Sequence, residues 1–139
     1  MNNYWHTNYM ADQEGPAAVH YALYPHGMFN AIEAYKRGLE QSQPLLVRRA
    51  AGASPVPVPL FTISSPGIVA TAVKRSSDGN ALIVRLFNAG ARPESFSISW
   101  GPFVPSTVYR SGLEETMDAP AGSSLWLPAF GIVTLRCEK

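Results

Sequence analysis

Apolar and polar residues alternate over short stretches along most of the chain, and this period of two predicts β-strands. In the second half the alternation covers residues 68–73, 81–87, 94–100, 104–110, 124–127 and 132–137. Between the first two stretches, residues 76–80 read SSDGN, a composition typical of a tight hairpin turn. We therefore expect the second half to fold as antiparallel strands joined by short turns.

Two further strands are expected near the start of the chain. Residues 3–9 are rich in aromatic residues and Thr, which suit a pleated surface. In residues 19–24 every second residue is clearly apolar, so one face of this strand is apolar and the other is mixed. His20 falls on the mixed face, where we expect a hydrogen-bonded structural histidine. The turn-forming residues 12–16 separate the two strands.

One short helix is expected over residues 30–41. Asn30 is a good N-cap, and Glu33 follows it three residues later, as in a capping box. The apolar residues that then recur at helical spacing are Ile32, Tyr35 and Leu39. The period changes here from two to about 3.6, which distinguishes this segment from the strands on either side.

Strands joined by tight turns, with one helix, indicate an all-β protein folded as an antiparallel β-sandwich. The 139 residues are enough for one domain with its own core, so we expect a single domain over residues 1–139. Within it, residues 48–59 are expected to be a proline-rich connector. Pro55, Pro57 and Pro59 each lack a backbone N–H and together favour an extended path.

Composition narrows the classes of partner. Hydrophobic residues make up 46% of the chain and charged residues 15%, with a net charge of +1. No basic face for nucleic acid is visible, and no apolar run approaches the ~20 residues that span a bilayer. The first residues lack the basic and apolar regions of a secretion signal, which favours the cytoplasm over export. The low charge is what a domain shows when part of its surface meets another domain.

Few residues suggest catalysis or metal binding. Cys137 is the single cysteine, which excludes an internal disulfide and a cysteine zinc site. Asp12 and Glu14 flank a turn residue, where solvated carboxylates are expected in preference to a cation site or an acid–base pair. Ser64 and Ser65 lack the GxSxG elbow of a serine nucleophile. We therefore expect no catalytic residue and no metal site in this chain.

The start of the chain, NNYWHTN, is unusually dense in aromatic and amide side chains. Aromatic faces stack on the apolar faces of sugar rings, and Asn or His side chains beside them hydrogen-bond the hydroxyl groups. We single out Trp5, His6 and Asn8 as candidate carbohydrate contacts. Trp100 and Trp126 are instead expected to pack in the core. From the residues alone, the chain is a β-sandwich with a candidate sugar-contacting face.

Several stretches of the chain occur in a characteristic order. They are residues 2–9 (NNYWHTNY), 13–15 (QEG), 19–26, 35–40, 44–45, 72–75, 82–88 and 127–136. The first two are similar to an NNxWxTN…QxG segment, and the last is similar to a PxEIkTLrl ending, with Gly131 where an acidic residue is usual. Together they resemble the C-terminal β-region of the glycoside hydrolase family 38 α-mannosidases over nearly the whole chain.

The resemblance implies a parent enzyme that is a retaining α-mannosidase with an Asp nucleophile and a zinc ion. In that family the nucleophile and the zinc ligands lie in an N-terminal α/β domain and in bridging segments, and none of those motifs is present here. The resemblance therefore implies no cofactor in this chain, zinc in the catalytic domain, and that domain as the partner. The chain is expected to begin part-way through the β-region and to be inactive alone.

Three hypotheses follow for what the chain does. In the first, it scaffolds or completes the carbohydrate site of the catalytic domain. In the second, it is a stand-alone module that binds mannose-containing carbohydrate through Trp5, His6 and Asn8. In the third, it is a β-domain with an interaction role only, which self-associates through surface normally covered by its partner.

Overall fold

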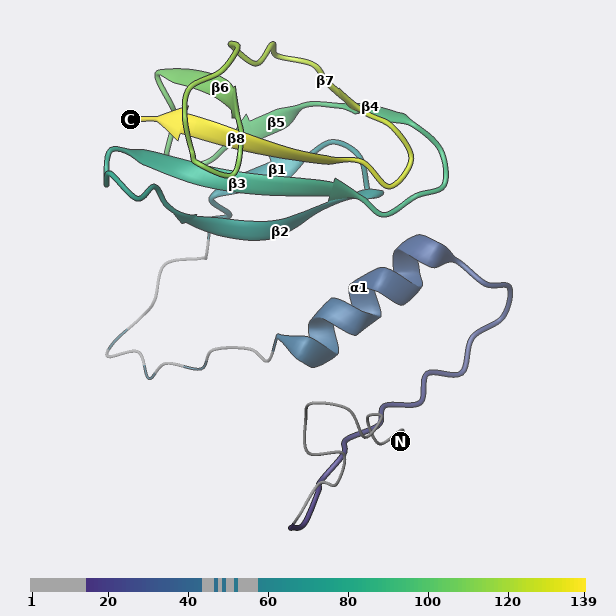
Figure 1. The fold of residues 1–139 in the computed structure, drawn as a ribbon. Coiled ribbons are helices and arrows are strands. Elements are labelled where there is room, and N and C mark those ends of the chain that lie inside the picture. The colour runs from purple at the N-terminus through teal and green to yellow at the C-terminus, as the bar shows by residue number, and fades with distance from the viewer. Residues whose placement is uncertain (1–14, 44–46, 48, 50–51, 53–57) are drawn as a thin grey trace, which may run out of the picture.

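The computed structural model describes residues 15–43, 47, 49, 52 and 58–139. The elements in this part of the chain are α1 (Ala31–Ser42), β1 (Phe61–Ile63), β2 (Ile68–Arg75), β3 (Ala81–Asn88), β4 (Glu94–Phe96), β5 (Ile98–Trp100), β6 (Thr107–Ser111), β7 (Leu125–Leu127) and β8 (Ile132–Glu138). Figure 1 shows the strands gathered into one body, with α1 lying outside it. The expected all-β class with a single short helix is confirmed. The expected strand over 3–9 and most of the connector over 48–59 lie outside the described residues.

Four strands form one sheet in the order β2-β3-β8-β6, and each neighbouring pair is antiparallel. At its centre, the register of β3 and β8 sets Val84 opposite Leu135 and Leu86 opposite Val133. Because side chains alternate along a strand, these four residues point to the same face of the sheet. They are all buried, so this face of the sheet is the core face.

The second layer consists of two short antiparallel pairs, β1-β5 and β4-β7. The sequence predicts one strand over 94–100, but the structure divides it at Ser97 into β4 and β5, which pair with different strands. The Ser97 N–H donates to Ser64 Oγ at 2.9 Å, and its carbonyl accepts from the Ser64 N–H at 3.1 Å. These bonds direct the chain after Ser97 toward β1, so that β5 pairs with β1 while β4 pairs with β7. Strands that bend and change partners in this way are common at the corners of β-sandwiches. β1 itself was not predicted, because three residues are too few to show alternation.

The core lies between the two layers, and every strand contributes to it. Its buried members are Ile68, Val84, Leu86, Phe96, Leu125, Leu127, Val133, Leu135 and Cys137. Trp100 is half-buried against this cluster, with its ring centroid 5.6 Å from that of Phe61. Trp126 alternates outward between two buried leucines and is exposed, so its predicted place in the core is wrong. Since both layers share one cluster, the strands form a β-sandwich.

Two sharp turns beside the central strands place glycines where a side chain is unfavourable. In the predicted hairpin over 76–80, Gly79 has a φ of 78° and its N–H donates to the Ser76 carbonyl at 2.9 Å. Before β8, a Cβ on Gly131 would lie 2.7 Å from Cδ of Pro128. The position at which the sequence departs from the family ending is therefore one where this turn admits no side chain.

Helix α1 begins where it was predicted, after Asn30. The Asn30 side chain accepts hydrogen bonds from the N–H groups of Ile32 at 3.0 Å and Glu33 at 3.3 Å. The half-buried side of the helix meets the outer face of the four-stranded sheet, where the Tyr35 ring lies 5.0 Å from that of Phe87. No residue of α1 is fully buried. The helix is thus attached to the surface of the sandwich and does not complete its core.

Residues 16–26 differ from the expectation. The sequence predicts a strand over 19–24, but the structure contains no strand there, and the segment is exposed along its length. His20 is also exposed, and no hydrogen bond from another described residue supports its predicted structural role. Alternation supplies the faces of a strand, but a strand also needs a neighbour to bond, and the described residues supply none. Among all the residues that the structure describes, no helix is long and apolar enough to cross a bilayer.

A cluster of charged residues covers the outer face of the four-stranded sheet. At its centre, Arg136 of β8 is only 7% exposed. Its guanidinium donates to the carboxylates of Asp78 and Glu138, each at 2.6 Å, and to the main-chain carbonyl of Glu115 at 2.9 Å. Because each of the three guanidinium nitrogens donates one of these bonds, the cluster ties the β2–β3 hairpin and the loop after β6 to the central strand β8.

Glu115 extends the charged cluster to the edge strand β2. Its carboxylate pairs with Lys74 and accepts a hydrogen bond from the Ser77 N–H at 2.7 Å. These contacts lower the pKa of Glu115 from its ordinary 4.5 to about 2, with the bond from Lys74 acting most strongly. The pKa of Asp78 also lies well below its ordinary range, because the Ser76 hydroxyl, the Asn80 N–H and Arg136 all donate to it. Both carboxylates therefore stay charged in the folded protein under mildly acidic conditions.

The substitution Leu135→Ala is expected to lower the free energy of unfolding by about 3 kcal/mol, because Leu135 is fully buried at the centre of the core. Leu113→Ala, which truncates an exposed leucine, should change it by less than about 0.5 kcal/mol. Urea unfolding of the full chain, followed by tryptophan fluorescence, measures both. Equal losses in the two variants would contradict the position of the core.

The charged cluster also predicts how stability depends on pH. Since the pKa of Glu115 is lower in the folded than in the unfolded chain, its contribution is complete above pH 4.5 and is lost as the pH falls toward 2. Glu115→Gln should therefore lower the melting temperature near neutral pH and reduce its fall between about pH 5 and pH 2. Melting curves followed by circular dichroism measure this. Glu114→Gln, at an exposed neighbour, should keep the wild-type fall, and an undiminished fall in Glu115→Gln would refute the assignment.

Candidate functional site

The three candidate carbohydrate contacts, Trp5, His6 and Asn8, all lie outside the described residues. Their contact with sugar therefore stays a prediction from the sequence. Among the described residues, two hollows are candidates for a functional surface. One lies beside α1, and the other lies at an edge of the sandwich.

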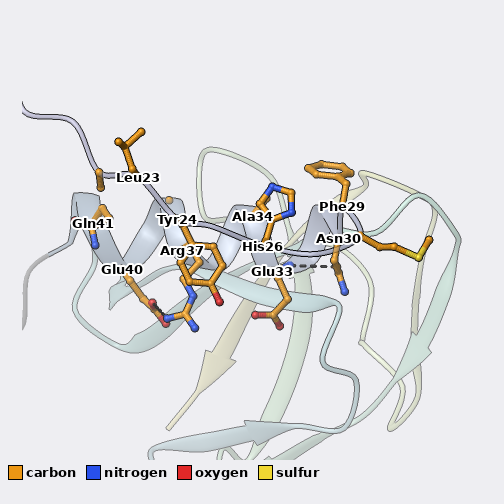
Figure 2. A pocket seen from close by; sticks show the side chains of 13 residues that line it. Leu23, Tyr24, His26, Phe29, Asn30, Glu33, Ala34, Arg37, Glu40 and Gln41 are labelled. Atoms are coloured by element: carbon orange, nitrogen blue, oxygen red, sulfur yellow. Dashed lines mark hydrogen bonds and ion pairs between the residues drawn. The ribbon is translucent and has the colours of Figure 1, made fainter.

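The first hollow, of about 570 Å³, lies between α1 and the segment that precedes it. Figure 2 shows this segment running along the helix, with side chains from both elements around the open space. The segment contributes the apolar side chains of Leu23, Met28 and Phe29, whereas the helix contributes the charged side chains of Glu33 and Arg37. Apolar walls with a few polar groups are typical of a binding surface.

The segment is held against the helix by the aromatic ring of Tyr24. The guanidinium of Arg37 lies over this ring, 4.8 Å from its centroid, and donates to the Glu40 carboxylate at 2.8 Å. The bond to Glu40, and next the interaction with Tyr24, raise the pKa of Arg37 above its ordinary value. Both members of this ion pair are exposed, so it contributes little to stability. Its effect is to keep the charge of Arg37 engaged at the side of the hollow.

Sequence reasoning did not identify this hollow, although the sequence contains a signal for it. Residues 15–32 include no Asp, Glu, Lys or Arg, and apolar residues recur up to the start of α1. Within this stretch, the alternation over residues 19–24 predicts a strand with one apolar face. The structure instead leaves Met28 and Phe29 exposed, so the same apolar residues form surface.

The second hollow, of about 450 Å³, lies between β5, β6 and the chain that leads into β7. Trp100 lines it together with the hydroxyl-bearing residues Ser106, Thr107 and Ser123. An aromatic ring beside hydroxyl groups suits a small polar ligand, but the Ser106 hydroxyl already donates to the Lys139 carbonyl at 3.1 Å. This hollow therefore offers fewer available groups than its composition suggests.

Several reactive side chains of the sandwich are committed to the fold. Burial raises the pKa of the Cys137 thiol to about 12, so it is protonated near neutral pH and is a poor nucleophile. The Ser65 hydroxyl donates to Glu94, and Ser64 Oγ accepts from the Ser97 N–H. The carboxylates around Arg136 are likewise bound to cations and N–H donors. None of these arrangements resembles a nucleophile beside a general base.

A metal ion has no prepared site in the part of the chain that the structure describes. No group of three or more His, Cys, Asp or Glu side chains is positioned there to hold one. The zinc ion implied by the family resemblance therefore does not fit these residues, and no step through zinc can be assigned to them.

The comparison with protein families agrees with this geometry. Residues 67–135 match the model of the glycosyl hydrolases family 38 C-terminal beta sandwich domain. The match runs from the start of β2 into β8 and so covers the central strands and most of the core. No curated protein and no solved structure matches the chain. Through residues 67–135, the chain belongs to the C-terminal β-sandwich domain family of the family 38 glycosyl hydrolases.

Proposed function

We propose that the chain acts as the C-terminal β-sandwich of an α-mannosidase-like glycosidase, and that it scaffolds or completes the carbohydrate site of the catalytic domain. The observation that carries this proposal is the family match over the strand body, residues 67–135. Catalysis by a glycosidase depends on a pair of carboxylates placed across the sugar. A domain without such a pair contributes by packing against the catalytic domain and positioning it.

The chemistry of the described residues favours a scaffolding role over a catalytic role. A glycosidase needs two carboxylates facing a common space, one of them with a raised pKa or free to attack the sugar. The carboxylates of Asp78 and Glu115 instead lie in the charged cluster with lowered pKa values. They serve to bind Arg136 and Lys74, which leaves hydrolysis to the catalytic domain.

The surface outside the sandwich supports the same proposal. The segment before helix α1 presents exposed apolar side chains around the hollow of Figure 2, including Leu23, Met28 and Phe29. A contiguous apolar patch of this kind marks an interaction site in a folded protein. The catalytic domain is the partner that the family membership suggests for it.

Reconstitution tests the proposal directly. The full chain alone, with zinc, should not hydrolyse an aryl α-mannoside above the buffer rate. Mixed with the family 38 catalytic domain encoded in the same genome, it should raise that domain's rate of hydrolysis by about tenfold or more, by supplying part of its sugar site or by holding its active conformation. Measurable zinc-dependent turnover by the chain alone, or no effect on the catalytic domain, would overturn the proposal.

A stand-alone carbohydrate-binding module is the alternative function. It would show itself as a change in tryptophan fluorescence when mannose oligosaccharides are added to the chain alone, with the change lost in Trp5→Ala. Trp126→Ala is the matched control, since Trp126 is exposed on the sandwich and should not affect that response. No response at millimolar sugar leaves the scaffold as the supported function.

A further inference from the structure

The segment before α1 has the side-chain pattern of a strand without the pairing of one. Val19, Tyr21 and Leu23 occupy alternate positions, and they are 50%, 84% and 94% exposed. The neighbours between them, His20 and Ala22, are less apolar. An apolar stripe at a period of two is the pattern of a strand that buries one face, yet here that face is in solvent.

Within the described residues, the backbone of the same segment has no pairing partner. No backbone hydrogen bond joins residues 16–26 to any other described residue. The segment is bounded by Gly15-Pro16 before it and by Pro25 after it, which limit the length of strand that can form to the residues between them. Unpaired N–H and C=O groups in a row are what a strand offers to the edge of another sheet.

The distribution of charge on this surface resembles that of an interface. Residues 15–32 contain no Asp, Glu, Lys or Arg, and charged residues resume on α1 with Glu33, Lys36 and Arg37. A neutral apolar centre beside a charged rim lets a partner dock without burying an unpaired charge. Exposed Met28, at 97%, and Phe29 continue the apolar centre toward the helix.

The size of the surface decides between a second copy and a larger partner. Two copies joined through residues 18–24 would form a two-stranded ribbon, which is marginal in water and would leave Tyr21 and Leu23 uncovered. Stable interfaces involve roughly 20–30 residues on each side. Residues 16–30 and the outer side of α1 approach that number only if one partner covers them together. A partner with a sheet edge would pair with the backbone of residues 18–24. An apolar layer beneath that edge would cover the exposed side chains.

We infer that residues 18–24 become a β-strand by adding to the edge of a sheet in the catalytic domain, with the face of Val19, Tyr21 and Leu23 buried in that partner. Met28, Phe29 and the hollow beside α1 extend the contact. This inference rests on the proposed function, since it takes the catalytic domain as the partner. In this inference the segment before α1 binds the catalytic domain, and the sandwich supports that segment.

Two neighbouring substitutions on opposite faces of the segment test the inference. Tyr21→Asp places a charge on the face to be buried and should weaken binding of the chain to the catalytic domain, measured by calorimetry, by about tenfold or more. His20→Asp places the same charge on the other face and should change the dissociation constant by less than about threefold. Neither residue belongs to the core of the sandwich, so both variants should keep the wild-type melting temperature.

Hydrogen exchange of the complex identifies the strand itself. The backbone amides of residues 18–24 should become protected when the full chain binds the catalytic domain. A complex in which these amides stay unprotected, or in which Tyr21→Asp binds as tightly as the wild type, overturns the inference while the proposed function stands. Failure to form any complex overturns both. A dimer of the chain alone that protects the same amides overturns the choice of partner.

Discussion

The structure depends on the pairing of β3 with β8. Among the described residues, these two strands supply the largest completely buried side chains, namely Val84, Leu86, Asn88, Leu135 and Cys137. They are far apart in the sequence, so their pairing closes a long loop within the family-matched region. β2 and β6 then add to the outer edges, and the two short pairs of the second layer close over the apolar face.

Polar contacts secure one end and the outer face of this central pair. At one end, the buried amide of Asn88 donates to the carbonyls of Arg92 at 2.8 Å and Pro128 at 2.9 Å, which joins the turns that flank β3 and β8. On the outer face, Arg136 binds the hairpin and the loop after β6. In the described residues no buried side-chain nitrogen or oxygen lacks a hydrogen-bond partner. The buried polar side chains of the sandwich are therefore satisfied within it, as a domain that positions a partner requires.

The segment before α1 and the helix itself are of a different kind. The helix meets the sandwich through half-buried contacts such as that of Tyr35 with Phe87, whereas the apolar side chains of the segment before it are exposed. Under the proposed function this contrast has a functional sense, because the chain would act beside a catalytic domain. Such a role requires a stable support, which the sandwich provides, and an apolar docking surface, which the segment before α1 provides.

Much of the sandwich could be predicted from the sequence because its signals are local. The SSDGN turn, the cap at Asn30 and the alternation in β3 and β8 each depend on neighbouring residues. The division at Ser97 could not be predicted, since it depends on Ser64, which is distant in the sequence. For the same reason, residues 19–24 have the pattern of a strand without forming one here: pairing is a property of two segments. The hollow beside α1 depends on where those unpaired residues lie, and no spacing motif marks it.

Amide hydrogen exchange of the full chain alone tests the central claim, that the sandwich is complete without the segment before α1. The slowest amides should be those of Val84, Leu86 and Leu135 in the central strands, with exchange limited by global unfolding. The amides of residues 16–26 should exchange many times faster, because no described residue bonds them. Protection of residues 16–26 equal to that of β3 in the isolated chain would contradict the account.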